Sequence, residues 1–377
     1  MSLSLRDALR RVPRGLLGMI ALVAACESFI VRDALKFSRI EADDWREAGH
    51  AADGELPKGG LLFFGDSQLK YGVSPLAIES KLGQPSHCLA VQSGQAPTSY
   101  FLLRRALASG VIPSAVVVDF EPHLMRDGIE HNQRMWPELL TFRETAELTW
   151  AARDPLAFAS INLGRLFPSY RARFEVRENL KAALRGETTG IASWLEMGVR
   201  NRGMNRGALL MAKSGNPHHD VTRWGNPTET PWTPAPINDH YARKFIKLAR
   251  SRNIPVYCAL MPVDPGLQEK YETNGMDRPY FAWLRALQDD YHNLYVLDWR
   301  HSGYDSRVMN DAMHLDHDGA AGITLALGEY LQKSYGGQGI DVRWVRMPGF
   351  RLDGARVAAE DSSRSHAFMM STAKLRR

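Results

Sequence analysis

Five short and nearly unbroken apolar runs recur along the chain, each bounded by turn-forming or charged residues. They cover residues 61–64, 87–91, 115–120, 256–260 and 294–298. A short apolar run without polar alternation is typical of a strand that is covered on both faces, as strands of parallel sheets are. We therefore predict a buried parallel sheet built from these five segments.

Helical patterns separate these predicted strands. Ser74 and Pro75 are suited to cap and begin a helix that ends near Leu82. Further helices are expected over residues 98–109, 239–252 and 279–291, and from His317 onward. Alternating strands and helices predict an α/β fold with helices on both faces of the sheet and ligands at the carboxyl ends of the strands.

The pattern also divides the chain into parts. Residues 36–335 form the predicted main domain, which begins with a charged helical connector over residues 36–60. Residues 125–238 break the alternation, and we interpret them as a long, mostly helical insertion that serves as a lid or a substrate wall. Residues 336–377 are basic with little periodicity, which predicts a partly disordered tail.

The N-terminus has the layout of a targeting segment. Residues 15–26 are apolar and follow four arginines, which predicts that residues 1–35 are a signal anchor or a lipoprotein signal. The apolar stretch is marginal for a membrane span because Glu27 interrupts it, and Cys26 closes a lipoprotein-like box. A buried amphipathic helix is the alternative. We expect an exported protein, held at the inner membrane through this segment or as a lipoprotein.

The composition of the chain limits the classes of partner and cofactor that we expect. Hydrophobic residues make up 44% of the chain and charged residues 24%, as in ordinary globular proteins. The net charge of +5 is concentrated near the two ends, and no nucleic-acid-binding motif is present, so we expect no nucleic acid partner. Three scattered cysteines fit neither a disulfide framework nor a zinc site. We interpret His218-His219-Asp220 as a solvated loop, and we expect neither a metal nor another cofactor.

Three groups of residues follow predicted strands and are suited to nucleophilic catalysis. Ser67 comes just after the first strand, Gly94 after the second, and Asp311 and His314 after the fifth. The carboxyl ends of parallel strands meet in one crevice. A serine hydroxyl needs a base to accept its proton and a third group to orient that base. We therefore predict Ser67 as nucleophile, His314 as general base and acid, and Asp311 as its orienting carboxylate, with oxyanion stabilisation by the backbone N–H groups of Ser67 and Gly94.

Together these motifs resemble the SGNH/GDSL hydrolase superfamily. The resemblance rests on Phe64-Gly65-Asp66-Ser67, Gly94 and Asp311-x-x-His314, and it spans about residues 60–335. It implies a flavodoxin-like, three-layer α/β/α fold, ester hydrolysis or acyl transfer through an acyl-serine, and no metal.

The third sequence block departs from this family pattern. The family usually has Gly-x-Asn-Asp there, with the Asn donating to the oxyanion, whereas this chain has Asp119-Phe120-Glu121-Pro122-His123. Gln68, Gln95 and His123 are candidates for the missing donor. The possible substrate-binding residues are Asp66, Gln68, Gln95, Glu121 and His123. A divergent third block resembles the envelope branch of the superfamily, whose membrane-anchored members move acetyl groups on polysaccharides.

Two classes of function are compatible with these patterns. The first is a serine ester hydrolase or O-acyltransferase acting on a small acyl ester or an acylated carbohydrate of the cell envelope or an exopolysaccharide. The second is a non-catalytic envelope protein of the same fold that binds a glycan or a partner protein. In the second case Ser67 is a helix cap, Gly94 a turn glycine, and Asp311 and His314 a pair that stabilises a turn.

Overall fold

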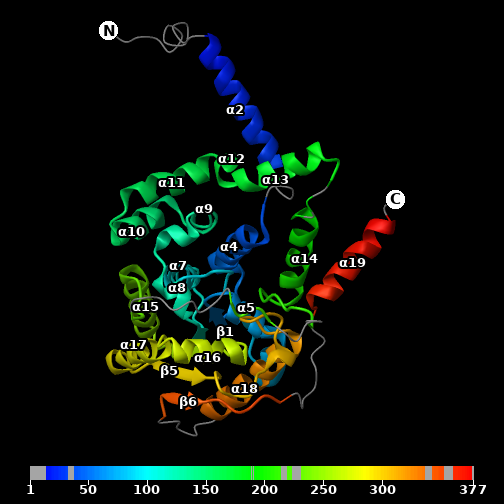
Figure 1. Cartoon of the computed structure of the whole chain (residues 1–377). Coiled ribbons are helices and arrows are strands. Elements are labelled where there is room, and N and C mark those ends of the chain that lie inside the picture. The colour runs from blue at the N-terminus through cyan, green and yellow to red at the C-terminus, as the bar shows by residue number, and fades with distance from the viewer. Residues whose placement is uncertain are drawn as a thin grey trace.

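The computed structural model describes residues 14–32, 38–187, 189, 191–213, 219–222, 231–335, 342–351 and 360–375. At its centre lies one sheet of six strands in the order β2-β1-β3-β4-β5-β6, and every neighbouring pair is parallel (Figure 1). The predicted α/β fold with a parallel sheet is confirmed. The strands are β1 (Leu61–Phe64), β2 (Ser86–Cys88), β3 (Ala115–Val118), β4 (Val256–Leu260), β5 (Leu294–Asp298) and β6 (Trp344–Arg346).

The strands follow the apolar runs closely. β1, β4 and β5 have the predicted bounds, whereas β2 and β3 each end before the predicted last residues. All residues of β1, β3 and β4 are buried. The chain turns away after Val118, where the N–H of Asp119 donates to the carbonyl of Phe64 and the Asp119 side chain joins the site described below.

Helices cover both faces of the sheet. Alternate strand residues enter two separate apolar cores, with Leu62 and Phe64 on one face and Leu61 and Phe63 on the other. The first core is covered by α7 (Ala96–Ala108), α15 (Pro236–Arg250), α16 (Pro265–Thr273) and α17 (Asp277–Asp290), and the second by α5 (Ser67–Gly72), α6 (Pro75–Leu82) and α18 (His317–Tyr335). The result is a three-layer arrangement.

The predicted connector is part of the core. It forms α4 (Ile40–His50) and a π-helical turn, η1 (Ala51–Glu55). Trp45 has no exposed surface, and its ring meets that of Trp136 edge-on with centroids 4.9 Å apart. The Trp45 indole N–H donates to the carbonyl of Gln92, 2.9 Å away, which ties α4 to the loop after β2.

The predicted insertion is largely helical. It lies mainly on one end of the molecule, where α2 (Arg14–Arg32) projects from α12 (Figure 1). No helix within the described ranges is both long and apolar enough to cross a membrane. The elements of the insertion are α8 (Pro122–Arg126), η2 (Ile129–Asn132), α9 (Trp136–Leu139), α10 (Phe142–Ala152), α11 (Pro155–Leu166), α12 (Pro168–Arg171), α13 (Arg173–Leu184) and α14 (Ile191–Met204).

The described residues of the tail form two elements that the sequence did not predict. β6 extends the sheet beyond β5, and α19 (Ser362–Leu375) packs against α14. The remaining element, η3 (Ser306–Val308), precedes the His314 loop. Met347 is buried, and Ser365 has no exposed surface. A three-residue strand and a weakly amphipathic helix are too short or too mixed to give a periodic signal.

Candidate active site

The three predicted catalytic side chains meet at the carboxyl edge of the sheet. The Ser67 hydroxyl lies 2.8 Å from Nε2 of His314. Nδ1 of the same ring lies 2.9 Å and 2.8 Å from the two carboxylate oxygens of Asp311. When Nδ1 carries the proton and donates it to Asp311, Nε2 is left as the acceptor for the serine hydroxyl. The side chains therefore form a continuous serine–histidine–aspartate relay.

The turn that presents Ser67 depends on Gly65. This glycine has a φ of 128°, and a Cβ atom placed on it would lie 1.5 Å from Oδ1 of Asp119. Oδ1 of Asp119 accepts the N–H of Asp66 at 2.8 Å, and Oδ2 accepts the N–H of Leu69 at 3.1 Å. Asp119 thus binds both sides of the turn around Ser67. Only a residue without a side chain allows this carboxylate to approach so closely.

Asp66 supports the same turn. Its side chain accepts the N–H of Gln68 at 2.7 Å and so caps α5. Asp66 is buried, and burial raises the pKa of its carboxyl. Burial, together with the charge of Asp66, also raises the pKa of Asp119 well above its ordinary range. Two adjacent buried carboxyl groups therefore do not both ionise readily.

The loop that carries His314 is held in place by hydrogen bonds between its own residues. Met309 and Leu315 form an antiparallel bridge, and the carbonyl of His314 accepts the N–H of Asn310 at 2.7 Å. Oδ1 of Asp311 accepts the N–H groups of Met313 and His314 at 2.8 Å and 3.0 Å. The Asp311 carboxylate therefore orients the imidazole from a position that the loop itself fixes.

The surroundings of Asp311 and His314 keep the carboxyl group of Asp311 ionised and the imidazole ring in place. Burial alone would raise the pKa of Asp311, but the hydrogen bond and charge of His314, together with two backbone N–H groups, lower it below its ordinary value. The ring of Tyr71 packs edge-on against the imidazole, with centroids 4.9 Å apart. Asp311 is thus an anion at neutral pH, and the tyrosine ring limits rotation of His314.

Gly94 does not have the predicted free N–H group. Its N–H donates to the carbonyl of Val91 at 2.9 Å, so in this arrangement it is not directed at an oxyanion. A Cβ atom on Gly94 would lie 2.2 Å from the carbonyl oxygen of Gly65. Close packing of the two turns therefore explains the glycine. The N–H of Ser67, which has no acceptor within the described part of the chain, is the remaining predicted donor.

Three of the five predicted substrate-binding residues have other roles. Asp66 caps α5, as described above. Nε2 of Gln95 lies within 3.2 Å of the carbonyls of Leu124, Asp127 and Gly128 and so binds the loop after β3. His123 packs against the ring of Tyr271, with centroids 5.1 Å apart, and burial lowers its pKa. These residues were predicted from their positions at strand ends, which do not reveal the direction of a side chain.

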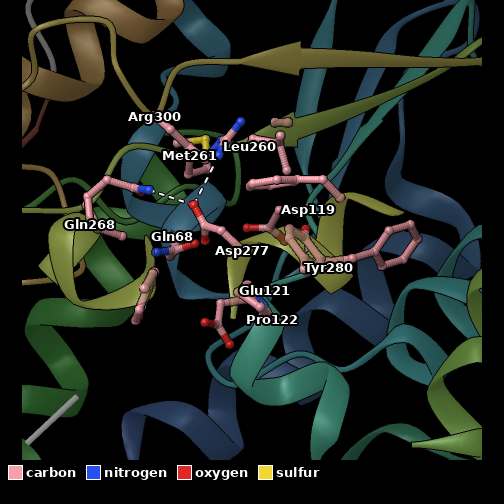
Figure 2. A pocket seen from close by; sticks show the side chains of 15 residues that line it. Gln68, Asp119, Glu121, Pro122, Leu260, Met261, Gln268, Asp277, Tyr280 and Arg300 are labelled. Carbon is pink, nitrogen blue, oxygen red and sulfur yellow. Dashed lines mark hydrogen bonds and ion pairs between the residues drawn. The ribbon is translucent and has the colours of Figure 1, made fainter. Parts of the chain in front are cut away.

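Gln68 and Glu121 line a pocket between the ends of β3 and β4 (Figure 2). Oε2 of Glu121 accepts the N–H of Leu124 at 2.7 Å, while Oε1 is buried with no partner among the described residues. Burial, and to a lesser degree the charge of Asp66, raises the pKa of Glu121 to about 8. At neutral pH this group is mostly a neutral acid that can donate a hydrogen bond into the pocket. The opposite wall of the pocket includes Asp277, which bonds to Gln268 and Arg300.

Sequence reasoning missed a buried ion pair behind α5. Nζ of Lys70 lies 2.5 Å from Oδ1 of Asp44, and both side chains are almost fully buried. Nζ also donates to the carbonyls of Ala90 and Gly207 at 3.0 Å and 2.9 Å. Oδ2 of Asp44 accepts the N–H of Gln92. This cluster joins α4, α5 and the loop after β2, one helical turn from Ser67. No sequence motif indicates this cluster, because its residues are far apart in the sequence.

Sequence reasoning also missed the role of Asn132. Its amide nitrogen donates to the carbonyl of Ser93 at 2.7 Å and to the side chain of Gln95 at 3.1 Å. Ser93 has a φ of 57°, which is unusual for a residue other than glycine. Asn132 therefore stabilises the strained loop that contains Gly94.

The interpretation of His218-His219-Asp220 as a solvated loop is wrong for His219. Its side chain is 5% exposed, and Nδ1 lies 3.1 Å from the carboxylate of Asp264. Residue 218 lies outside the described residues. His219 thus joins the insertion to the start of α16.

Comparison with known proteins adds no family to this geometry. The sequence matches no protein-family model, and no curated protein matches it.

Proposed function

We propose that the chain is a serine ester hydrolase or O-acyltransferase of the SGNH type. The observation that carries the proposal is the relay from Ser67 through His314 to Asp311, with hydrogen-bond distances at both steps. Such a relay activates a serine hydroxyl for attack on a carbonyl carbon. Its position at the carboxyl edge of a parallel sheet is also where this class of fold binds ligands.

The proposed reaction has two steps, acylation of Ser67 and removal of the acyl group. The Ser67 oxygen forms a bond to the carbonyl carbon while Nε2 of His314 accepts the hydroxyl proton. The bond to the leaving alcohol then breaks, and His314 returns the proton to that alcohol, which leaves an acyl-Ser67. In the second step, the oxygen of water or of another hydroxyl group attacks the acyl carbon while His314 accepts its proton. The bond to the Ser67 oxygen then breaks, and His314 returns the proton to that oxygen. The same intermediate serves hydrolysis and transfer.

The proposed substrate is an O-acyl ester, with an acetylated carbohydrate of the envelope or an exopolysaccharide as the preferred class. Support comes from the small pocket lined by Glu121 and by Gln68, the neighbour of Ser67, where a protonated Glu121 offers a hydrogen-bond donor to a hydroxyl or carbonyl oxygen. The proposal includes export and tethering through the N-terminal segment. The exposed apolar side chains of α2 support that part.

One observation favours the alternative of a non-catalytic glycan- or partner-binding protein. The N–H of Gly94 is engaged by Val91, so only one of the two predicted oxyanion donors is available. The loss of one such donor typically lowers a rate by about 10²–10³, which weakens catalysis without abolishing it. The intact relay therefore makes the enzyme the better-supported proposal.

A serine-directed fluorophosphonate probe separates the two functions. We expect the wild-type chain to be labelled on Ser67 and to release p-nitrophenol from p-nitrophenyl acetate, and we expect Ser67→Ala to lose both activities. Ser93→Ala is the matched control, because that serine lies in the neighbouring loop. Absence of labelling and of an acyl-enzyme by mass spectrometry in a folded wild-type protein would contradict the proposal.

A further inference from the structure

The helix α2 leaves the body of the protein at α12 (Figure 1). The Glu27 carboxylate accepts the N–H of Ser169 at 2.9 Å and also bonds to its hydroxyl group, which holds the base of α2 against α12. Farther along, the helix exposes large apolar side chains to its surroundings. These are Leu16, Leu17, Met19, Ile20, Leu22 and Val23.

The helix α11 is apolar on two opposite sides. One side packs on α9 and α10, and the other side is exposed. The exposed side is not a charged one, because Arg165 is the only charged residue of the helix. Leu156 is 80% exposed and Leu166 is 71% exposed. The exposed stripe consists of Leu156, Ala159, Leu163 and Leu166, and the buried stripe of Ala157, Ile161 and Gly164. An exposed apolar stripe of this kind is ordinarily covered by protein or by lipid.

The helix α13 carries charge on both its buried and its exposed side, and its exposed Glu178 pairs with Lys181. In α13 the buried residue is Glu175, whose side chain is 3% exposed and pairs with Arg39 and Arg134. The outward residues of the same helix include Leu180 and Leu184, which are 60% and 80% exposed. The buried carboxylate of Glu175 beside exposed leucines reverses the usual arrangement of a water-facing helix.

Basic groups accompany this apolar surface. Arg173, Arg177 and Arg185 are exposed along α13. At the base of α2 an open cavity is lined by arginines from α4, α12 and the segments next to them, with two glutamates among them. Its charged lining residues are Arg39, Arg46, Arg134, Arg171, Glu138 and Glu175, four positive charges against two negative ones.

We infer that α2, α11 and α13 together form a face that lies on an anionic phospholipid membrane. In this arrangement α11 and α13 rest at the interface with their leucines among the acyl chains, and the arginines of α13 and of the cavity contact lipid phosphates. An apolar stripe flanked by arginine is the pattern that binds helices to such surfaces. The inference rests on the membrane tethering through α2 proposed above and extends that contact to the helical insertion, whereas it does not depend on the proposed ester chemistry.

The charge of the face distinguishes a membrane from a second copy of the chain. A symmetric dimer through this face would bring its arginines close to those of the partner, and like charges across an interface oppose association. An anionic lipid surface instead supplies the opposite charge. An anionic phospholipid layer therefore matches both the exposed leucines, which need apolar surroundings, and the arginines, which need negative charge.

Vesicle flotation with the full chain tests this inference. We expect binding to vesicles of phosphatidylcholine with phosphatidylglycerol, and weaker binding to phosphatidylcholine alone. Leu166→Glu should weaken binding roughly tenfold, because a leucine leaves the apolar layer. Arg177→Ser should weaken binding to the anionic vesicles by about fivefold and leave binding to phosphatidylcholine unchanged.

Val342→Glu is the matched control, because it adds the same charge at another exposed apolar side chain, beside β6 at the opposite end of the molecule (Figure 1). It should bind vesicles as the wild type does. Circular dichroism and thermal unfolding confirm that each variant is folded. Equal losses for Leu166→Glu and Val342→Glu, or no binding of the wild type to anionic vesicles, would overturn the inference. So would a dimer in sedimentation without lipid that Leu166→Glu dissociates.

Discussion

The carboxyl edge of the sheet and the helical layer of α10 to α13 place their side chains in opposite ways. At the sheet edge, apolar residues are buried and the polar groups around Ser67 are directed at one another, so that Asp119 alone accepts two backbone N–H groups. In the helical layer, the carboxylate of Glu175 is buried while Leu156 and Leu184 are exposed. The first arrangement positions a reactive group, and the second suits contact with an apolar phase.

The comparison also shows where stability and function coincide. At the sheet edge Asp66 and Asp119 hold the turn that presents Ser67, and Asp311 holds the loop of His314, so a change there should affect both folding and activity. On the outside of the helical layer the exposed leucines have few protein neighbours to lose. Substitutions at the sheet edge should therefore change activity and stability together, whereas substitutions of the exposed leucines should change stability little.

The largest effect is expected at the orienting carboxylate. Asp311→Asn keeps the size of the side chain but no longer favours the required protonation of Nδ1 of His314. We expect the rate of p-nitrophenyl acetate hydrolysis to fall by roughly 10³–10⁴, together with a smaller loss of thermal stability, because the ionised carboxylate of Asp311 also holds its own loop. Asp305→Asn is the control, because Asp305 is an aspartate of the same loop region that pairs with Arg307 instead. Equal activity of the two variants would remove Asp311 from the relay.

A large loss of stability is expected behind α5. Lys70→Met removes the nearer of two cations from the buried carboxylate of Asp44 and leaves only Arg202, 3.8 Å away, which should lower the free energy of unfolding by about 3–5 kcal/mol. Urea unfolding measures this loss. The double variant Lys70→Met/Asp44→Leu should recover much of it, because both charges are then absent. A double variant no more stable than the single one would show that the pair itself is not the cause.

A smaller loss is expected at the Ser67 turn. Gly65→Ala forces a Cβ atom into the space of the Asp119 carboxylate at a φ of 128°. We expect the free energy of unfolding to fall by about 1–3 kcal/mol, together with reduced fluorophosphonate labelling. Gly83→Ala is the control, because Gly83 also has a positive φ but its Cβ position is open. Similar labelling of the two variants would mean that Asp119 does not position the nucleophile.

A pH dependence is expected from Glu121. Its pKa of about 8 lies above the ordinary value of 4.5, so the folded protein holds this proton more tightly than the unfolded chain does. The contribution of this group to stability is therefore complete below about pH 4.5 and is lost as pH rises through 8. Glu121→Gln should lack this part of the pH dependence, as measured by urea unfolding between pH 5 and 9. Parallel profiles for variant and wild type would contradict the assignment.

The smallest effect is expected outside the helical layer. Leu156→Ser replaces a leucine that is 80% exposed, so the free energy of unfolding should change by less than about 0.5 kcal/mol. Ile161→Ser, on the buried side of the same helix, should cost several times more. Thermal unfolding distinguishes them. A large loss for Leu156→Ser would show that the exposed stripe packs against the protein in solution.

The sheet and the relay were predictable from sequence because both depend on local signals. Buried parallel strands give unbroken apolar runs, and Asp311-x-x-His314 places acid and base in one short loop. The function of Asp119 was not predictable, since it depends on the distance between two strand ends. The buried pair of Lys70 and Asp44 escaped prediction for the same reason. Likewise, the N–H of Gly94 has a direction that its residue type does not encode.

The buried contacts of α4 determine where the chain can be divided. Because Trp45 fills the core and Asp44 holds Lys70, the folded domain begins before Ile40, well ahead of its first strand. A protease that detaches the domain from α2 must therefore cut between Arg32 and Ile40 to leave a working fragment. A cut after Gly49 would remove a wall of the core and the counterion of Lys70 together. The same boundary applies to any fragment prepared for crystallisation.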